Sequence, residues 1–138
     1  MGYSIQTSVG AGFDETVDAT IDALGDEGFG VLSDIDVQAT LEQKIGEEFR
    51  NYRILGACIP ALAFEALSEE IEIGTLLPCN VVVYETDDGT VVVSAVDPET
   101  LLNVADNRAL DDLAQDVGAR LERVLRALDD EFENESDA

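Results

Sequence analysis

The sequence predicts a single α+β domain, a mixed β-sheet with helices packed on it in the order β-α-β-α-β-α-β-β-α. The chain of 138 residues is long enough for one domain with its own core, and 46% of its residues are hydrophobic. Two β-branched runs joined by Asp-Asp-Gly, in "NVVVYETDDGTVVVSAV", indicate a hairpin, and apolar residues elsewhere recur at helical spacing. We expect the domain to span residues 1–130 and residues 131–138 to form a flexible acidic tail.

The first elements are a strand and a helix. "YSIQTSV", residues 3–9, alternates as a strand does, and "GAGF" turns the chain into a helix expected to begin at the cap Asp14. "GDEG" then ends this helix. Its inward face is predicted to carry Val17, Ile21 and Leu24.

The middle of the chain repeats this alternation. "FGVLSDI" predicts a second strand, after which Asp36 caps a short helix over Val37–Ile45 that Gly46 closes. "YRILGACI" is typical of a buried strand. Pro60 suits the first turn of the following helix, "ALAFEALSEE", because its missing N–H is not needed there.

The last third contains the hairpin, a turn at "DPET" and a final amphipathic helix over residues 107–130. The inward face of that helix is expected to carry Leu110, Leu113, Val117, Leu121, Val124 and Leu128.

The charge of the chain is extreme. It has 31 acidic and 7 basic residues, a net charge of −24, and a single lysine, Lys44. Carboxylate excess with so little lysine is typical of proteins that work in molar salt, where the Debye length falls to about 3 Å and like charges are screened. We therefore expect a halophilic protein from a salt-accumulating cytoplasm. Binding to a nucleic-acid backbone is disfavoured, because it requires clustered Lys and Arg.

The sequence argues against a membrane span, a dinucleotide-binding turn and histidine-dependent catalytic or metal sites. The longest apolar run, Ile54–Phe64, is too short to span a bilayer, and we expect no signal peptide and a cytoplasmic location with reduced thiols. "VGAGFDE" imitates a dinucleotide-binding turn, but Glu15 occupies the third glycine position. The chain has no histidine, which removes Ser-His-Asp and Cys-His nucleophiles and His-ligated metals.

The two cysteines, Cys58 and Cys79, are the candidate chemical groups. Cys58 comes just before the helix that begins near Pro60, where a helix N-terminus favours a thiolate. Cys79 comes just before an apolar strand. Both are equally compatible with small buried side chains, since free cysteine is often found in cores. Their spacing favours no metal, and two ligands leave a zinc site incomplete.

Two blocks around these cysteines, "YRILGACIPALAFEAL" and "IGTLLPCNVVVYE", together with the hairpin and "VSAVDPETLL", resemble the DUF302 family of small α+β domains of unknown general function. The resemblance covers most of the chain, from "SIQTSV" to Leu102. The first block departs from the usual Cys-Asn-Pro, because Ile59 stands in the middle position. The resemblance implies a dimer and a site where strand ends bring Cys58 and Cys79 together.

These observations predict a non-catalytic or sensory module that binds a small ligand or cofactor of unidentified chemistry. The candidate ligand-binding residues are Cys58, Pro60, Pro78, Cys79, Asn80, Lys44, Tyr52 and Arg53. Lys44 has a simpler explanation as a cation near a helix C-terminus, and Tyr52 and Arg53 as ordinary strand residues. Two alternatives remain open: a thiol redox or sulfur-transfer enzyme using both cysteines, and a structural dimerisation domain in which they only pack.

Overall fold

The computed structural model describes the backbone of residues 2–137 and the side chains of residues 2–132. It confirms the single α+β domain and the predicted order of its main elements. These are β1 (Ser4–Val9), α1 (Phe13–Asp26), β2 (Gly30–Asp36), α2 (Val37–Ile45), β3 (Tyr52–Cys58), α3 (Pro60–Glu69), β4 (Cys79–Glu85), β5 (Val91–Val96) and α5 (Asp111–Asp137). Three short helices are added: η1 (Ile71–Leu76), α4 (Pro98–Asn103) and η2 (Arg108–Leu110). Within the described backbone no helix is long and apolar enough to cross a membrane.

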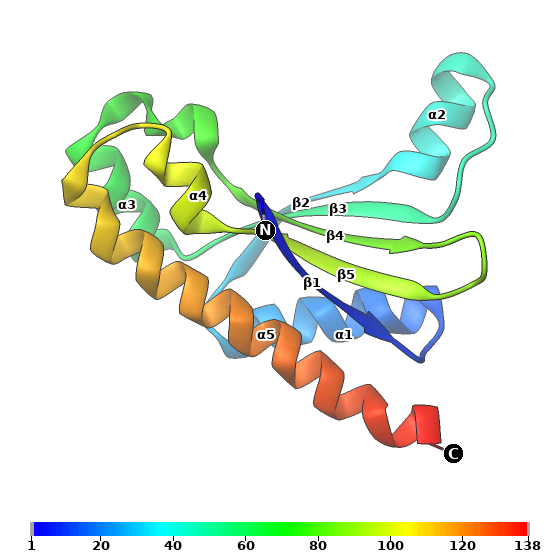
Figure 1. Ribbon diagram of the computed structural model, residues 1–138. Coiled ribbons are helices and arrows are strands. Elements are labelled where there is room, and N and C mark those ends of the chain that lie inside the picture. The colour runs from blue at the N-terminus through cyan, green and yellow to red at the C-terminus, as the bar shows by residue number, and fades with distance from the viewer. Residues whose placement is uncertain (1, 138) are drawn as a thin grey trace.

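The sheet is antiparallel at every pairing of the described strands, which corrects the expected mixed sheet. Its strand order is β1-β5-β4-β3-β2. The connection through α1 carries the chain from one edge of the sheet to the other, so β1 and β2 never pair. The helices between β3 and β4 lie beyond the end of the sheet, so β4 starts where β3 ends and runs back beside it (Figure 1).

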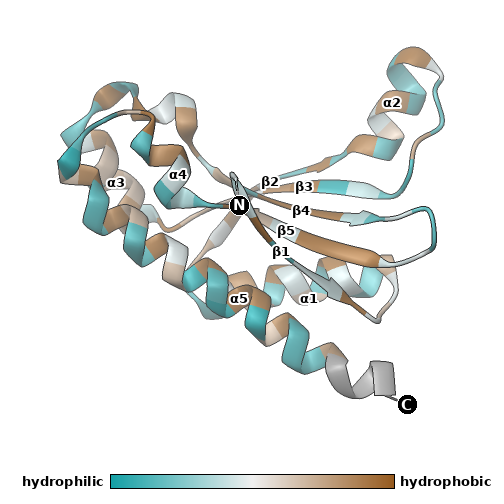
Figure 2. Cartoon of the chain, in the orientation of Figure 1, coloured by the Kyte–Doolittle hydropathy of each residue, from teal (hydrophilic) through white to brown (hydrophobic). Residues whose placement is uncertain are grey.

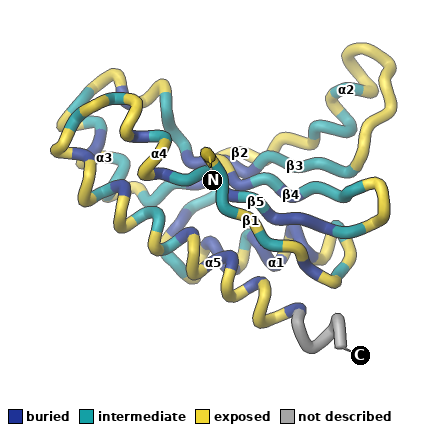
Figure 3. The backbone as a smooth tube through the Cα atoms, in the orientation of Figure 1, coloured by how far each residue is buried: buried dark blue, intermediate teal, exposed yellow. Residues whose placement is uncertain are grey.

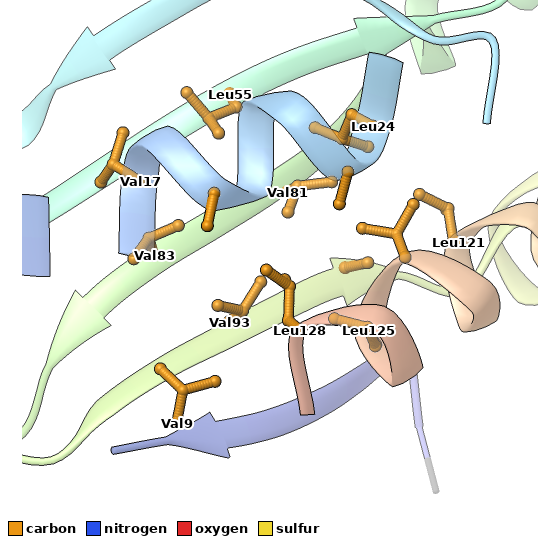
Figure 4. Packing of buried hydrophobic residues seen from close by; sticks show 14 of the residues in the cluster. Val9, Val17, Leu24, Leu55, Val81, Val83, Val93, Leu121, Leu125 and Leu128 are labelled. Atoms are coloured by element: carbon orange, nitrogen blue, oxygen red, sulfur yellow. The ribbon is translucent and has the colours of Figure 1, made fainter. Parts of the chain in front are cut away.

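One face of the sheet is covered by α1 and α5 (Figure 1). Leu55, Val83 and Val93 point from the strands toward these helices. Leu24 of α1 and Leu128 of α5 pack against them from the helices (Figure 4). Burial of each such side chain contributes about 1.5–3 kcal/mol. The hydropathy colours follow this arrangement, since β5 is strongly apolar and the outer turns of α5 are polar (Figure 2). We call this side of the sheet the covered face.

The ends of the helices follow local capping rules, with one correction. α1 begins at Phe13 with Gly12 as its N-cap, so Asp14 does not cap it but lies in its first turn, where a carboxylate is favoured by the helix dipole. α2 agrees with the prediction, because the Asp36 carboxylate accepts a hydrogen bond from the Ala39 N–H and Gly46 ends the helix in a left-handed conformation at φ 70°.

The C-terminal part is more helical than expected. "DPET" begins the helix α4 instead of forming a turn alone, because the Asp97 carboxylate accepts from the Glu99 N–H and Pro98 suits the first turn. α5 continues past residue 130, and buried and exposed positions alternate along it (Figure 3). Phe132 is only 2% exposed and belongs to the main core. The folded domain therefore includes Phe132. The tail predicted to be flexible spans residues 131–138, and the side chains of residues 133–138 lie outside the described part of the structure.

A second, smaller hydrophobic cluster lies at the end of the sheet. It is formed by α3, η1, α4, η2 and the start of α5, and α3 packs mainly on η1 and η2. Its buried members are Ala66, Ile73, Leu102, Leu110 and Ala114. The domain thus has a main core under the sheet and a satellite core beside it.

Candidate functional site

The two cysteines lie on neighbouring strands at the end of the sheet that meets the satellite core. Cys79 opens β4 and is directly opposite Ala57 of β3 in the antiparallel register. Cys58 is the last residue of β3, two residues before α3 begins. Cys79 is buried, with 8% of its surface exposed, and Cys58 is half-buried. The predicted convergence of strand ends therefore places both residues in one region.

Both cysteines border a single apolar cavity of about 40 Å³. Its lining is Phe29, Ala57, Cys58, Ile59, Leu62, Ala63, Ala66, Leu77, Cys79, Pro98, Leu102, Leu113 and Val117. The cavity lies at the seam between the two hydrophobic clusters, since Ala57 belongs to the main core and Ala66 and Leu102 to the satellite core. The thiols are the only titratable side chains in this lining.

Burial controls the chemistry of Cys79. Desolvation, and secondarily the nearby Cys58 thiol, raises the pKa of Cys79 to about 11. At neutral pH Cys79 is therefore a protonated thiol, which is a weak nucleophile and a weak metal ligand. Within the described side chains, no group of three or more Cys, Asp or Glu residues is arranged to hold a metal ion.

The two sequence blocks also meet on the other side of the strands. A Cβ on Gly56 would lie 2.9 Å from Cγ of Pro78, and Oγ of Ser33 would lie closer still. Gly56 belongs to the first block and Pro78 to the second, so the proline ring packs on the strand where only a glycine leaves room. The blocks therefore hold the strand ends together as well as supplying the cysteines.

Tyr52 and Asn80 lie away from the cavity. Strand alternation places both on the sheet face opposite α1 and α5, where they border a shallow hollow. The Tyr52 ring stacks on Tyr84 at a centroid distance of 5.5 Å and an interplanar angle of 15°. Asn80 is exposed there. These two predicted site residues share a surface with each other and not with Cys79.

Arg53 and Lys44 lie elsewhere again. The Arg53 guanidinium donates two hydrogen bonds to the Asp34 carboxylate, at 2.7 and 2.5 Å, and this holds the pKa of Asp34 below its usual range. Lys44 is exposed in the last turn of α2, where the helix dipole favours a cation. In Figure 1, α2 projects at the opposite end of the sheet from α3. Pro60 occupies the first turn of α3, as predicted.

The structure adds apolar lining residues that the sequence did not single out. Phe29 precedes β2, Leu62 lies on α3, Leu102 on α4 and Val117 on α5. Each fits the helical or strand pattern of an ordinary core residue, so no local signal marks it as part of a cavity. Only the tertiary arrangement brings these elements around the cysteines.

The comparisons with known proteins agree with this fold. The family model described as "Domain of unknown function DUF302" matches residues 5–128. A crystal structure of an uncharacterized conserved DUF302 protein from Bacillus stearothermophilus is similar, with 30% sequence identity and a TM-score of 0.86. The match covers 93% of this chain and 99% of that one. A search of curated proteins finds no match. The chain therefore belongs to the DUF302 family.

Proposed function

We propose that this protein is a non-catalytic binding module that holds a small, largely apolar ligand in the cavity beside Cys58 and Cys79. The observation that carries the proposal is that both cysteines border one apolar cavity whose other lining side chains are hydrocarbon. Concave, mainly apolar sites with a few polar groups are the usual form of small-molecule sites. The two thiols would supply the polar or soft contacts that orient the ligand.

The lining favours binding over catalysis. General acid–base catalysis needs a group that titrates near the working pH and reaches the substrate. No Asp, Glu, Lys or Arg side chain lines this cavity. Burial keeps Cys79 protonated at neutral pH, with a pKa of about 11. These features support a site that holds its ligand without transforming it.

The size and position of the cavity define the class of ligand. A volume of about 40 Å³ admits only a few atoms in the closed state. A larger ligand would require α3 and its neighbours to move away from the sheet, and the cavity lies at the seam between two separate hydrophobic clusters, where such movement leaves each cluster intact. A macrocycle such as haem does not fit without that opening.

The redox alternative rests on Cys58, which is half-buried and closer to solvent than Cys79. It requires the two sulfurs to approach within bonding distance. Cys79 is opposite Ala57 in the register, and Cys58, the next residue along β3, borders the same cavity as Cys79. We retain this enzyme activity as the second candidate, and pure packing as the third.

Ligand binding is tested by thermal shift and methyl NMR in about 2 M KCl, with xenon, short-chain apolar molecules, thiol metabolites, metal ions and haem as probes. We expect xenon or a short apolar molecule to perturb the methyl signals of Leu62, Leu102 and Val117. A ligand at about 100 times its Kd should add about 2.7 kcal/mol to the free energy of unfolding.

Two matched variants on α3 complete this test. Ala63 lines the cavity, whereas Ala61 is exposed and does not. Ala63→Val should abolish the methyl perturbations, because its added methyl groups fill the cavity, and Ala61→Val should leave them unchanged. If none of the probes perturbs the lining methyls of the natural protein, the binding function is wrong and packing becomes the best explanation of the cysteines.

A further inference from the structure

One face of the sheet is left without helices. It lies between α2 and the α3–α4 end, on the opposite side from α1 and α5, and we call it the open face (Figure 1). The hollow that Tyr52 and Asn80 border lies on this face and measures about 480 Å³. Small-molecule sites usually measure about 300–1,000 Å³. The hollow is separate from the cysteine cavity, since no described residue lines both.

The register of the strands gathers unpaired polar groups in this hollow. Gln6 of β1 is directly opposite Ser94 of β5, and Ser94 is directly opposite Val82 of β4. Asn80 lies two residues before Val82 and therefore on the same face of the sheet. Within the described part of the chain, the side chains of Gln6, Asn80 and Ser94 make no hydrogen bond. Each amide therefore keeps both its donor and its acceptor for water or for a ligand.

A row of three aromatic rings lies beside these polar groups. Tyr52 contacts two rings, Tyr84 at 5.5 Å and Phe49 at 6.0 Å between centroids. Tyr84 ends the row, because among the described rings it contacts Tyr52 alone, and it also lines the hollow. The second face of the Tyr84 ring is therefore the one on which a planar ligand can stack. Nucleobases stack readily on aromatic side chains, since every base has a π-face.

The hollow is uncharged, although the chain has 31 acidic and 7 basic residues. None of its described lining residues is Asp, Glu, Lys or Arg. Binding of phosphate groups requires clustered Lys and Arg, and a net charge of −24 repels anions. A cationic ligand would be attracted to the carboxylates outside the hollow. The ligand that suits the hollow is therefore neutral.

The amide of Gln6 and the spacing along β4 narrow the class of ligand. A side-chain amide pairs with the edge of adenine through two hydrogen bonds, one accepted from the amino group and one donated to the adjacent ring nitrogen. Tyr84 and Asn80 are four residues apart on β4, which is roughly 14 Å along a strand. A base stacked on Tyr84 does not reach Asn80 by itself, whereas a base with an attached sugar does.

We infer that the hollow on the open face binds a neutral purine nucleoside of the adenine type. The base stacks on Tyr84 and pairs with the amide of Gln6, and the ribose hydroxyls bond to Asn80. Tyr52 holds the Tyr84 ring in place from its other side. This site is additional to the cavity of the proposed function, and it gives Tyr52 and Asn80 a role apart from the cysteines.

Binding is measured by NMR titration in about 2 M KCl, with adenosine, inosine, adenosine monophosphate and ribose as probes. We expect adenosine to shift the side-chain amide signals of Gln6 and Asn80 and the ring signals of Tyr84, with a Kd on the order of 1 mM. Inosine should bind about fivefold more weakly, because it lacks the amino group that the amide recognises. Adenosine monophosphate should bind no more tightly than adenosine, because no cation in the described lining would hold its phosphate.

Three results would overturn the inference. They are the absence of any shift with adenosine at about ten times the expected Kd, tighter binding of adenosine monophosphate, and equal binding of ribose alone. If the same signals shift when the protein is diluted without ligand, a second copy covers the open face and the inference is also wrong.

Two matched glutamine variants test the contact with the base. Gln6 lines the hollow, whereas Gln43 lies on α2 outside it, and both are exposed. Circular dichroism should therefore show Gln6→Ala and Gln43→Ala folded. Gln6→Ala should remove the preference for adenosine over inosine, and Gln43→Ala should keep it. A preference that survives in Gln6→Ala would contradict the assigned contact.

Further variants separate this site from the cavity. Asn80→Ala should weaken adenosine binding about fivefold, because a hydrogen bond to the ribose is lost. Asn103→Ala, on α4 and outside the hollow, should leave binding unchanged. Ala63→Val, which fills the cysteine cavity, should also leave it unchanged. Loss of adenosine binding in Ala63→Val would place the nucleoside in the cavity and show the inference to be wrong.

Discussion

Transfer from about 2 M KCl to dilute buffer should lower the Tm of this protein by about 10 °C, a loss of about 3 kcal/mol for a domain of this size. The reason is the imbalance between 31 acidic and 7 basic residues. Four ion pairs join described side chains, and all lie at least partly in solvent. Most carboxylates therefore repel one another over distances that only concentrated salt screens.

The measurement is thermal unfolding followed by circular dichroism across a series of KCl concentrations. NaCl at equal ionic strength should protect equally, because screening depends on ionic strength. Sucrose at equal osmolality should protect much less. A Tm that does not change with salt, or that sucrose fully restores, would mean that charge repulsion is not what salt relieves and that the halophilic interpretation is wrong.

Replacing Gly56 with alanine should destabilise the protein by about 1–3 kcal/mol, the usual cost of forcing an extra methyl group into a packed site. The new Cβ would lie 2.9 Å from Cγ of Pro78, and a proline ring cannot swing aside as a flexible side chain does. The added methyl group should therefore push Pro78, next to Cys79, away from β3. Urea unfolding in about 2 M KCl measures the loss.

Gly25→Ala is the matched control for this substitution. Gly25 lies within α1 and a Cβ there would meet no atom within 4 Å. This second variant should stabilise the protein by about 0.5–1 kcal/mol, since alanine is the better helix former. Equal effects of the two changes would show that Pro78 does not pack on Gly56 as the structure has it.

The order of elements could be predicted because each main element carries its own local signal. Asp36 and Gly46 mark the ends of α2, Pro60 marks the start of α3, and the Asp-Asp-Gly turn marks the hairpin. Strand direction could not be predicted in this way. It depends on whether a connecting helix crosses the sheet or stays at its end, and that is decided by tertiary packing (Figure 1).

The candidate site was predictable only in part. The two blocks identified Cys58 and Cys79, and the strand register brings their strand ends together. The sequence could not show that Asn80 points away from Cys79, because a residue's face is set by the register of the whole strand. It also grouped Lys44 with the cysteines, although α2 lies at the other end of the sheet (Figure 1).

The most direct test of the proposed site is the rate at which a small apolar thiol reagent modifies Cys79 in the folded protein. The experiment uses the Cys58→Ala background in about 2 M KCl. It is run at one alkaline pH below 11, because the raised pKa of Cys79, about 11, leaves little thiolate at neutral pH. We predict modification faster than global unfolding allows, slowed at least about tenfold by Ala63→Val and unaffected by Ala61→Val. Modification at the rate of global unfolding in all three proteins would contradict the account, and Cys79 would then be a closed core residue.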